Sequence, residues 1–299
     1  MTIPMKVSKT HASGNDFIVY ADPKGEYDPE ELEVKVLCDR HFGVGGDGVI
    51  RLVPVQYVRD LDPAIVQECE EKGAEWFMDY RNADGSIAEM CGNGTRAISL
   101  FALRNEYISL VQGDSYPLGT RAGVKVIKFL DDYEPTGKNS FQVNLGAYQC
   151  GELDEYTVTL PGEDGAAAGT FVDMGNPHVV VPVEEESSTL SDLTMLKLNA
   201  QPLVSPVLSQ GQNVEFVRVD KVDVDQNFGE ATMRVYERGV GETLSCGTGL
   251  GATAVVLREK TGISNWRITV PGGVLLIEVH DDEVILTGSA MLVSNIELL

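Results

Sequence analysis

The alternation of apolar and polar residues along the chain predicts many short strands and two strongly apolar helices. Runs rich in β-branched residues, separated by turn residues, predict strands such as 7–10, 49–55, 214–219, 232–237 and 274–279. The apolar runs 97–103 and 252–257 predict the two helices, which begin just after Cys91 and Cys246. Short strands around two apolar helices predict an α+β fold with two barrel-like domains, each wrapped around its own helix.

The two helix starts belong to an internal repeat. Cys91-Gly92-Asn93-Gly94 and Cys246-Gly247-Thr248-Gly249 are separated by 246 − 91 = 155 residues. A Gly-Asn element precedes each, at Gly14-Asn15 and at Gly175-Asn176. Self-similarity at this long period indicates two related domains rather than a solenoid. We place the boundary between them in the polar stretch 131–139.

Each of the two cysteines is expected at a helix N-terminus, facing unpaired backbone N–H groups and the positive end of the helix dipole. Such surroundings lower the pKa of a thiol and make it a candidate base. Two thiols on opposite sides of one carbon can remove a proton from one face and return it on the other, which inverts the centre. The helix N–H groups can stabilise the charge that develops on an α-carboxylate. One sulfur must then be a thiolate while the other is a thiol, so the pair titrates as a unit.

Composition narrows the range of partners. The 299 residues include 46 acidic and 23 basic ones, a net charge of −23, which argues against nucleic acid and anionic membranes. The five cysteines are widely spaced without Cys-x-x-Cys, and the four histidines are scattered, so neither a disulfide scaffold nor a metal site is expected. The N-terminal residues lack a signal-peptide core, and no apolar run approaches the roughly 18 residues of a membrane span. A reducing cytoplasm is therefore expected.

A nucleotide cofactor is also not expected. Gly43-Val44-Gly45-Gly46-Asp47-Gly48 has the spelling of a dinucleotide loop, but a predicted helix precedes it and a predicted strand follows it, which reverses the required order. Gly247-x-Gly249 opens a helix, but the acidic residue that should follow about 20 positions on is missing. No lysine stands in a recognisable pyridoxal-phosphate context.

At its repeat motifs the chain resembles the diaminopimelate epimerase family. The resemblance is carried by Gly14-Asn15-Asp16-Phe17, Asn82-Ala83-Asp84-Gly85, Cys91-Gly92-Asn93-Gly94, Gly175-Asn176-Pro177-His178, Asn213, and Glu237-Arg238-Gly239 through Cys246-Gly247-Thr248-Gly249. It implies an isomerase that interconverts LL- and meso-diaminopimelate in lysine and peptidoglycan precursor biosynthesis. No cofactor is implied, and Cys91 and Cys246 are the implied acid/base pair.

The resemblance also implies the family fold and its domain division. Two similar domains, related by a pseudo-twofold axis, are each a mostly antiparallel β-barrel around a central α-helix, and the last strand returns to the first domain. The expected domains are residues 1–139 plus 289–299, which carry Cys91, and residues 140–288, which carry Cys246. The active site is expected in the cleft between them.

The remaining implied site residues make chemical sense. His178 and Glu237 are expected to assist deprotonation of the thiols. Arg238 offers a planar fork for the carboxylate of the second, non-inverted centre of the substrate, and Glu237 offers a charge for its ammonium. The implied substrate-binding residues are Asn15, Asn82, Gly92, Asn93, Asn176, Asn213, Glu237, Arg238, Gly247 and Thr248. One departure is Gly48, where some family members carry glutamine, so a side-chain contact is lost there.

Two other interpretations stay open. One is an epimerase or racemase of another amino acid, similar to proline racemase. Glu237 and Arg238 argue against it, because a substrate with a single centre has no far end for them to hold. A thiol redox protein using Cys91 and Cys246 predicts reversible disulfide formation without exchange at any α-carbon. The expected partner is a small zwitterion, and a homodimer is left open.

Overall fold

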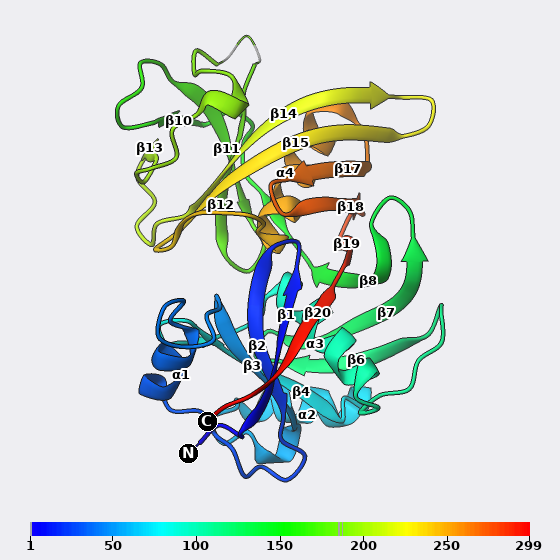
Figure 1. Cartoon of the computed structure of the whole chain (residues 1–299). Helices are drawn as coiled ribbons and strands as arrows, with labels where there is room; N and C mark the ends of the chain where they lie inside the picture. The colour runs from blue at the N-terminus through cyan, green and yellow to red at the C-terminus, as the bar shows by residue number, and fades with distance from the viewer. Residues whose placement is uncertain (1, 185, 187) are drawn as a thin grey trace. The chain divides into compact units, whose positions relative to one another are not determined.

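The computed structural model describes residues 2–184, 186 and 188–299 (Figure 1). The chain forms two compact units, one made of the residues up to Val143 together with Gly288–Leu299, and the other of Asn144–Thr287. The division therefore lies four residues beyond the expected 139/140 boundary, and one residue before the expected 288/289 boundary. The reason is that the polar stretch 131–139 is the turn region of a hairpin, whose second strand continues past it to Gly146.

The described residues of the first unit form nine strands. They are β1 (Lys6–Ala12), β2 (Asn15–Ala21), β3 (Gly48–Pro54), β4 (Trp76–Asn82), β5 (Ile87–Ala88), β6 (Ser115–Thr120), β7 (Gly123–Tyr133), β8 (Gly137–Gly146) and the C-terminal β20 (Met291–Glu297). Their pairing order is β20-β1-β2-β3-β4-β6-β7-β8, with β5 added to β4. Only β2–β3 and β4–β6 among these pairs are parallel. The last strand of the chain thus pairs with the first, as expected (Figure 1).

The centre of this unit is α3 (Gly92–Arg104). Every residue from Gly92 to Ala102 is buried, and the helix packs against β1, β2, β3, β7 and β20. A helix that is buried on all sides belongs in a core rather than on a surface. The strands of the first unit therefore wrap around α3, and the helix start at Cys91 is fixed by packing along the whole helix.

Two further helices cover apolar clusters on the outside of these strands. α1 (Glu31–Cys38) buries Val34, Leu37 and Cys38, and α2 (Pro63–Lys72) buries Cys69. No side chain caps the N-terminus of α1, and the nearby Asp28 instead pairs with Arg51 at 3.5 Å. The N-terminus of α2 is capped by the side chain of Asp62. A short 3₁₀ turn (Val55–Tyr57) connects β3 to this region.

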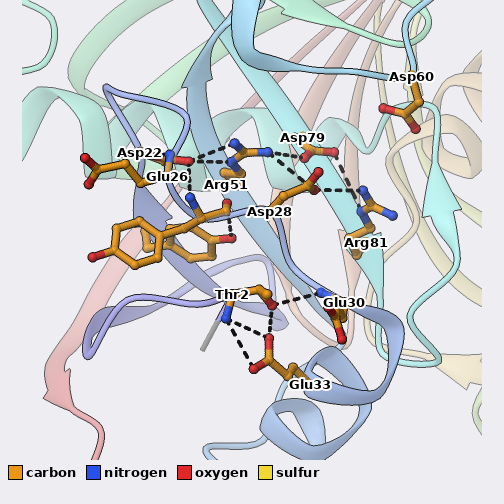
Figure 2. A network of polar contacts seen from close by, with 12 residues as sticks. Thr2, Asp22, Glu26, Asp28, Glu30, Glu33, Arg51, Asp60, Asp79 and Arg81 are labelled. Carbon is orange, nitrogen blue, oxygen red and sulfur yellow. Dashed lines mark hydrogen bonds and ion pairs between the residues drawn. The ribbon is translucent and has the colours of Figure 1, made fainter.

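A buried network of charges ties several of these strands together (Figure 2). Arg51 and Asp79 are each 1% exposed, and the Arg51 guanidinium lies between Asp22 and Asp79, at 2.7 Å and 3.4 Å. Arg121 donates to the other oxygen of Asp79 at 2.7 Å and to the more exposed Asp60 at 2.9 Å. Removing one member of such a network leaves buried charge unpaired, so these residues hold β3, β4 and the β6–β7 hairpin in one arrangement.

The second unit is built from the strands β9 to β19. They are β9 (Gln149–Cys150), β10 (Tyr156–Thr159), β11 (Ala167–Asp173), β12 (Pro177–Pro182), β13 (Leu203–Ser205), β14 (Asn213–Asp223), β15 (Phe228–Glu237), β16 (Gly241–Thr243), β17 (Asn265–Val270), β18 (Gly273–Val279) and β19 (Val284–Ser289). Their main pairing order is β9-β11-β12-β14-β15-β17-β18-β19, with β16 added to β15 and β10–β13 added to β11. The central helix is α4 (Gly247–Thr261), and a 3₁₀ turn (Leu193–Met195) lies in the connection before β13.

The two units have the same strand plan. In the first unit, the antiparallel hairpin β1–β2 is followed by the parallel pair β2–β3 and the antiparallel pair β3–β4, and α3 lies between β5 and β6 in the chain. In the second unit, the hairpin β11–β12 is followed by the parallel pair β12–β14 and the antiparallel pair β14–β15, and α4 lies between β16 and β17. Registers repeat as well: Arg81 pairs with Ile87, and Tyr236 with Glu242, both shifted by 155. The fold is therefore α+β with two similar, mostly antiparallel units around central helices, as expected. No helix in the described part of the chain is both long and apolar enough to cross a bilayer.

Candidate active site

The first unit positions Cys91 as the residue immediately before α3. Its backbone is extended (φ −141°, ψ 118°), its carbonyl accepts the N–H of Thr95 at 2.9 Å, and its sulfur accepts the N–H of Gly94 at 3.4 Å. The thiol is therefore a side-chain cap of the helix, at the end where backbone N–H groups are unpaired within the helix. This is the placement that the sequence predicts for Cys91.

Asn15 lies beside this thiol. Its Oδ1 is 3.5 Å from Cys91 Sγ and accepts from Asn93 Nδ2 at 3.3 Å, while its Nδ2 donates to Asp47 at 2.6 Å. Because the carboxylate of Asp47 accepts from the nitrogen, the amide of Asn15 is held with its oxygen toward the cysteine. Three predicted site residues, Asn15, Cys91 and Asn93, are thus in contact through side chains.

A fully buried arginine lies directly below this group. Arg96 is 0% exposed and donates to the carbonyls of Gly92, at 3.3 Å, and Ser289, at 3.4 Å, and to Oδ1 of Asn93. Burial lowers the pKa of Arg96 to about 10, and attraction to the sulfur of Cys91 opposes that shift. The side chain is therefore still a cation at neutral pH.

The second unit positions Cys246 in the same way before α4. Its backbone is extended (φ −123°, ψ 117°), and its carbonyl accepts from Leu250 at 3.0 Å. Its sulfur lies 3.6 Å from the hydroxyl of Thr248. Burial first, and then the carboxylates of Glu237 and Glu215, raise the pKa of Cys246 well above its ordinary value. The expectation that a helix start lowers the pKa of this thiol is therefore wrong, because burial and two acidic neighbours outweigh the helix N–H groups.

Glu237, the last residue of β15, contacts the thiol of Cys246 and accepts from the hydroxyl of Thr243. Burial raises the pKa of Glu237, and the nearby Glu215 raises it further, while the bonds from Thr243 and Cys246 act in the opposite direction. The Glu237 carboxyl group therefore holds its proton to a higher pH than an exposed glutamate does.

His178 and Glu215 form a buried pair behind this site. Both are 0% exposed, and His178 Nδ1 lies 2.7 Å from Glu215 Oε1. His178 Nε2 lies 3.1 Å from Oδ1 of Asn176. Each ring nitrogen of His178 therefore has a side-chain partner, Glu215 on one side and Asn176 on the other. Asn176 and His178, which the sequence predicts separately, are therefore directly linked.

The other predicted residues have clear positions. Asn213, at the start of β14, accepts the backbone N–H of Arg238 at 3.0 Å and donates to the carbonyl of Pro177 at 3.3 Å, so it fixes the ends of two strands of the second unit. The exposed Arg238 side chain donates to the carbonyl of Gln210 at 2.7 Å. Asn82, at the end of β4, donates to the hydroxyl of Ser86 within its own turn, at 3.0 Å.

The surroundings of Gly48 leave no room for a glutamine side chain at this position. A Cβ at Gly48 would collide with the backbone oxygen of Arg81 and with the ring of Tyr80. The lost side-chain contact at this position is therefore accompanied by an inward ring of Tyr80, 7% exposed, which occupies the space.

Two residues that shape these sites were not predicted from the sequence, Glu215 and Arg96. Glu215 lies within the mostly apolar run 214–219, and Arg96 lies within the α3 helix. A buried charge must have a specific partner, but the sequence does not show which charged positions of these segments are buried.

Solved structures of other proteins have the same fold. A phenazine biosynthesis protein of the PhzF family from Bacillus anthracis matches with a TM-score of 0.65 at 16% identity, over 98% of each chain. A probable proline racemase from Agrobacterium radiobacter matches with a TM-score of 0.63 at 15% identity, over 98% of this chain and 92% of that one. The chain therefore belongs to the structural class that has the fold of these proteins.

Sequence comparison identifies the family within that class. The family model described as diaminopimelate epimerase matches residues 7–150 and 170–293. The diaminopimelate epimerase of Corynebacterium glutamicum (strain R) is 38% identical over 98% of this chain and 97% of its own. That of Thermobifida fusca is 36% identical over 97% of each chain. The chain belongs to the diaminopimelate epimerase family, and it is an isomerase.

Proposed function

We propose that the protein interconverts LL- and meso-diaminopimelate by two-base proton transfer without a cofactor, in lysine and peptidoglycan precursor biosynthesis. The observation that carries the proposal is the pair of matched helix starts, Cys91 before α3 and Cys246 before α4, in a chain of this family. In the proposal the two thiols act on opposite faces of one α-carbon of the substrate. One removes the α-proton and the other delivers a proton to the opposite face.

The helix starts supply the electrostatic part of the mechanism. The α-hydrogen of an amino acid is a very weak acid, so the charge of the carbanion must be stabilised as it spreads onto the α-carboxylate. The first backbone N–H groups of an α-helix point away from its own carbonyls, and in α3 and α4 this first turn begins at Gly92 and Gly247. We propose that they bind this carboxylate, where the positive ends of the helix dipoles favour negative charge.

The other site residues have separate roles in this proposal. Glu237 contacts the sulfur of Cys246 and has a raised pKa, which supports a role in proton exchange with that thiol. His178 is proposed to assist it through its contact with Glu215, at 2.7 Å. Arg238, whose side chain is exposed, is proposed to bind the carboxylate of the non-inverted centre as a planar fork. Asn15, Asn82, Asn176 and Asn213 are proposed to fix the handedness of that centre.

The pair works only while both thiols are reduced, which supports a reducing compartment, and we propose the cytoplasm. All five cysteines, among them Cys91 and Cys246, are free. The proposed partner is the small zwitterionic substrate itself.

The test is deuterium uptake at the α-carbon. Reduced protein is incubated with LL-diaminopimelate in heavy water without added cofactor, and the α-proton is followed by NMR. Loss of the signal together with appearance of the meso isomer is the expected result. Cys91→Ser and Cys246→Ser should each slow inversion by at least about 10²- to 10⁴-fold, the usual contribution of a positioned acid or base. Cys150→Ser, a free cysteine on β9, is the matched control and should leave the rate unchanged.

The outcomes separate the alternatives. No exchange with verified free thiols would sink the substrate assignment. Exchange and inversion of proline under the same conditions would favour a racemase of another amino acid. Reversible loss of two mass units without exchange at any α-carbon would favour a thiol redox protein.

A further inference from the structure

The matched positions of the two units differ in charge around the two cysteines. The residue on the strand that faces the third residue of the central helix is Ile50 in the first unit and Glu215 in the second. Ile50 pairs with Tyr80 and Glu215 with Val235, and 235 − 80 = 155. A Cβ on Gly94 would lie 3.1 Å from Ile50, and one on Gly249 would lie 2.5 Å from Glu215. An apolar side chain in one unit is thus replaced by a carboxylate in the other.

A second matched position differs in the opposite sense. Arg96 on α3 corresponds to Gly251 on α4, since 251 − 96 = 155. The Arg96 guanidinium is fully buried and bonds only neutral oxygens: the carbonyls of Gly92 and Ser289, and Oδ1 of Asn93. Across residues 2–184, 186 and 188–299, no carboxylate forms an ion pair with Arg96. A buried cation without a carboxylate partner is costly unless another anion compensates it.

Cys91 is the group in reach that can supply this anion. The sulfur belongs to the same helix start, and attraction between it and Arg96 is the one charge interaction that raises the pKa of the guanidinium. A continuous set of side-chain contacts also joins the two groups, from Arg96 to Asn93, from Asn93 to Asn15, and from Asn15 to the sulfur.

Other charged groups near Cys91 compensate one another. Asp16 and Asp47 lie on the far side of Asn15 and pair with Lys9 and Arg40, which makes two carboxylates and two cations. Although burial opposes it, hydrogen bonds from Arg40 and Lys9 hold the pKa of Asp16 well below its ordinary range. Glu89, two residues before Cys91, is exposed to solvent. Arg96 is therefore the uncompensated charge beside Cys91 in the described part of the first unit.

The surroundings of Cys246 have the opposite balance. Glu237 and Glu215 face this thiol, and the charge of each carboxylate raises its pKa. Two neighbouring carboxyl groups disfavour a further negative charge on the sulfur. Burial acts in the same direction and raises the pKa of Cys246.

We infer that the single negative charge of the cysteine pair rests on Cys91 in the substrate-free protein, and that Arg96 is the positioning residue that keeps it there. This inference rests on the proposed function for its meaning in catalysis. The Cys91 thiolate takes the α-proton and forms an S–H bond. The electron pair of the broken C–H bond stays on the α-carbon of the substrate. Cys246 then delivers its thiol proton to the opposite face as the new C–H bond forms.

The protein is left with a thiol at Cys91 and a thiolate at Cys246. That charge now lies beside two carboxyl groups, so it is less stable than before. The resting form returns when Cys246 gains a proton from solvent and Cys91 loses one. The substrate isomer that presents its α-hydrogen to Cys91 therefore reacts with the resting form directly.

The test measures the titration of each thiol without substrate. Reduced protein is pulsed with iodoacetamide from pH 5 to 10, and alkylation of the two cysteines is quantified on separate peptides by mass spectrometry. The midpoint of each rate profile is compared rather than the rate, because Cys246 is only 8% exposed. In the wild type, the midpoint of Cys91 should lie below that of Cys246 and below the ordinary thiol value of about 8.5.

Variants of Arg96 separate charge from shape. Arg96→Met should raise the Cys91 midpoint by about 1 to 3 units, the effect of removing an opposite charge nearby, and leave the Cys246 midpoint unchanged. Arg96→Lys keeps the charge but loses the planar fork, so it should restore most of the shift. Arg104→Met removes an exposed charge from the last turn of the same helix and is the control, with no shift expected.

Each outcome decides the question. An unchanged Cys91 midpoint in Arg96→Met, or a Cys246 midpoint below that of Cys91 in the wild type, would overturn the inference. Equal shifts in Arg96→Met and Arg96→Lys would show that packing, not charge, is responsible. If Arg96→Met does not fold, as judged by circular dichroism, the order of the two wild-type midpoints still decides. Because no diaminopimelate is present, failure of the substrate assignment appears only in the deuterium experiment.

Discussion

Gly249, in the first turn of α4, is the position where the smallest change in the chain should have the clearest effect on the site. A Cβ at Gly249 would lie 2.5 Å from Glu215 Oε1 and 3.1 Å from its Cδ and Cγ. Ordinary contact begins at 3.4 Å, so the carboxylate must move by about 3.4 − 2.5 = 0.9 Å. Glu215 has little freedom to do so, because it is fully buried and held by His178 at 2.7 Å.

The magnitude follows from two opposing effects on Gly249→Ala. Replacing glycine by alanine in a helix stabilises it by up to about 1 kcal/mol. Overpacking a filled interior costs about 1 to 3 kcal/mol. We therefore expect a net loss of up to about 2 kcal/mol in the free energy of unfolding. Catalysis should suffer more, because a displacement near 1 Å at a positioned group can reduce the rate by about 10²-fold.

The assay combines urea unfolding, followed by circular dichroism, with kcat for epimerisation. Gly251→Ala is the matched control, two residues further along the same helix. Its Cβ would meet the flexible end of Met174 at 2.9 Å, which can rotate away, so stability and kcat should stay near wild type. A Gly249→Ala protein with wild-type kcat and stability would refute the reasoning, because it would mean that the Glu215 carboxylate is not held against the helix start.

Two further predictions concern buried charge. Asp79→Asn should lower the free energy of unfolding by about 3 to 5 kcal/mol, because it breaks a buried ion network. Asp60→Asn, at the exposed edge of the same network, should lower it by less than about 1 kcal/mol. Urea unfolding of both variants measures the two changes. Burial raises the pKa of Glu237 above 4.5, so the folded state binds this proton more tightly than the unfolded chain does. The stability that the bound proton contributes is therefore present below about pH 4.5 and is lost as the pH rises through the raised pKa. Glu237→Gln should therefore gain stability relative to the wild type between pH 4 and 7, and a difference that stays constant across this range would contradict the assigned direction.

Much of the fold was predictable because the two halves of the chain carry the same sequence motifs. The repeated Cys-Gly-x-Gly motifs, 155 residues apart, placed both central helices, and the helices begin where expected at Gly92 and Gly247. The boundary at 131–139 was wrong because polarity marks solvent exposure, and the turn of a long hairpin is as polar as a linker. Sequence periodicity does not distinguish these two cases.

The candidate site was predictable only in part. Asn15, Cys91 and Asn93 meet because their motifs lie at the ends of neighbouring elements, which a repeat pattern can indicate. Glu215 and Arg96 act through contacts made across strands, from positions that look like ordinary members of apolar runs. The direction of the Cys246 pKa depends on burial and on Glu215, neither of which is visible in the spacing of a motif.

The pairing of β20 with β1 has a consequence for how the protein is made. Residues 291–297 follow the second unit in the chain and are synthesised after it, yet they complete the unit whose other strands come first. Until they arrive, β1 is an open strand edge, which is the kind of surface that pairs with other chains and aggregates. The second unit is continuous in sequence and has no such requirement. A chain cut before residue 291 therefore retains one whole unit but leaves the other with an exposed edge, so such products are prone to removal or aggregation rather than partial function.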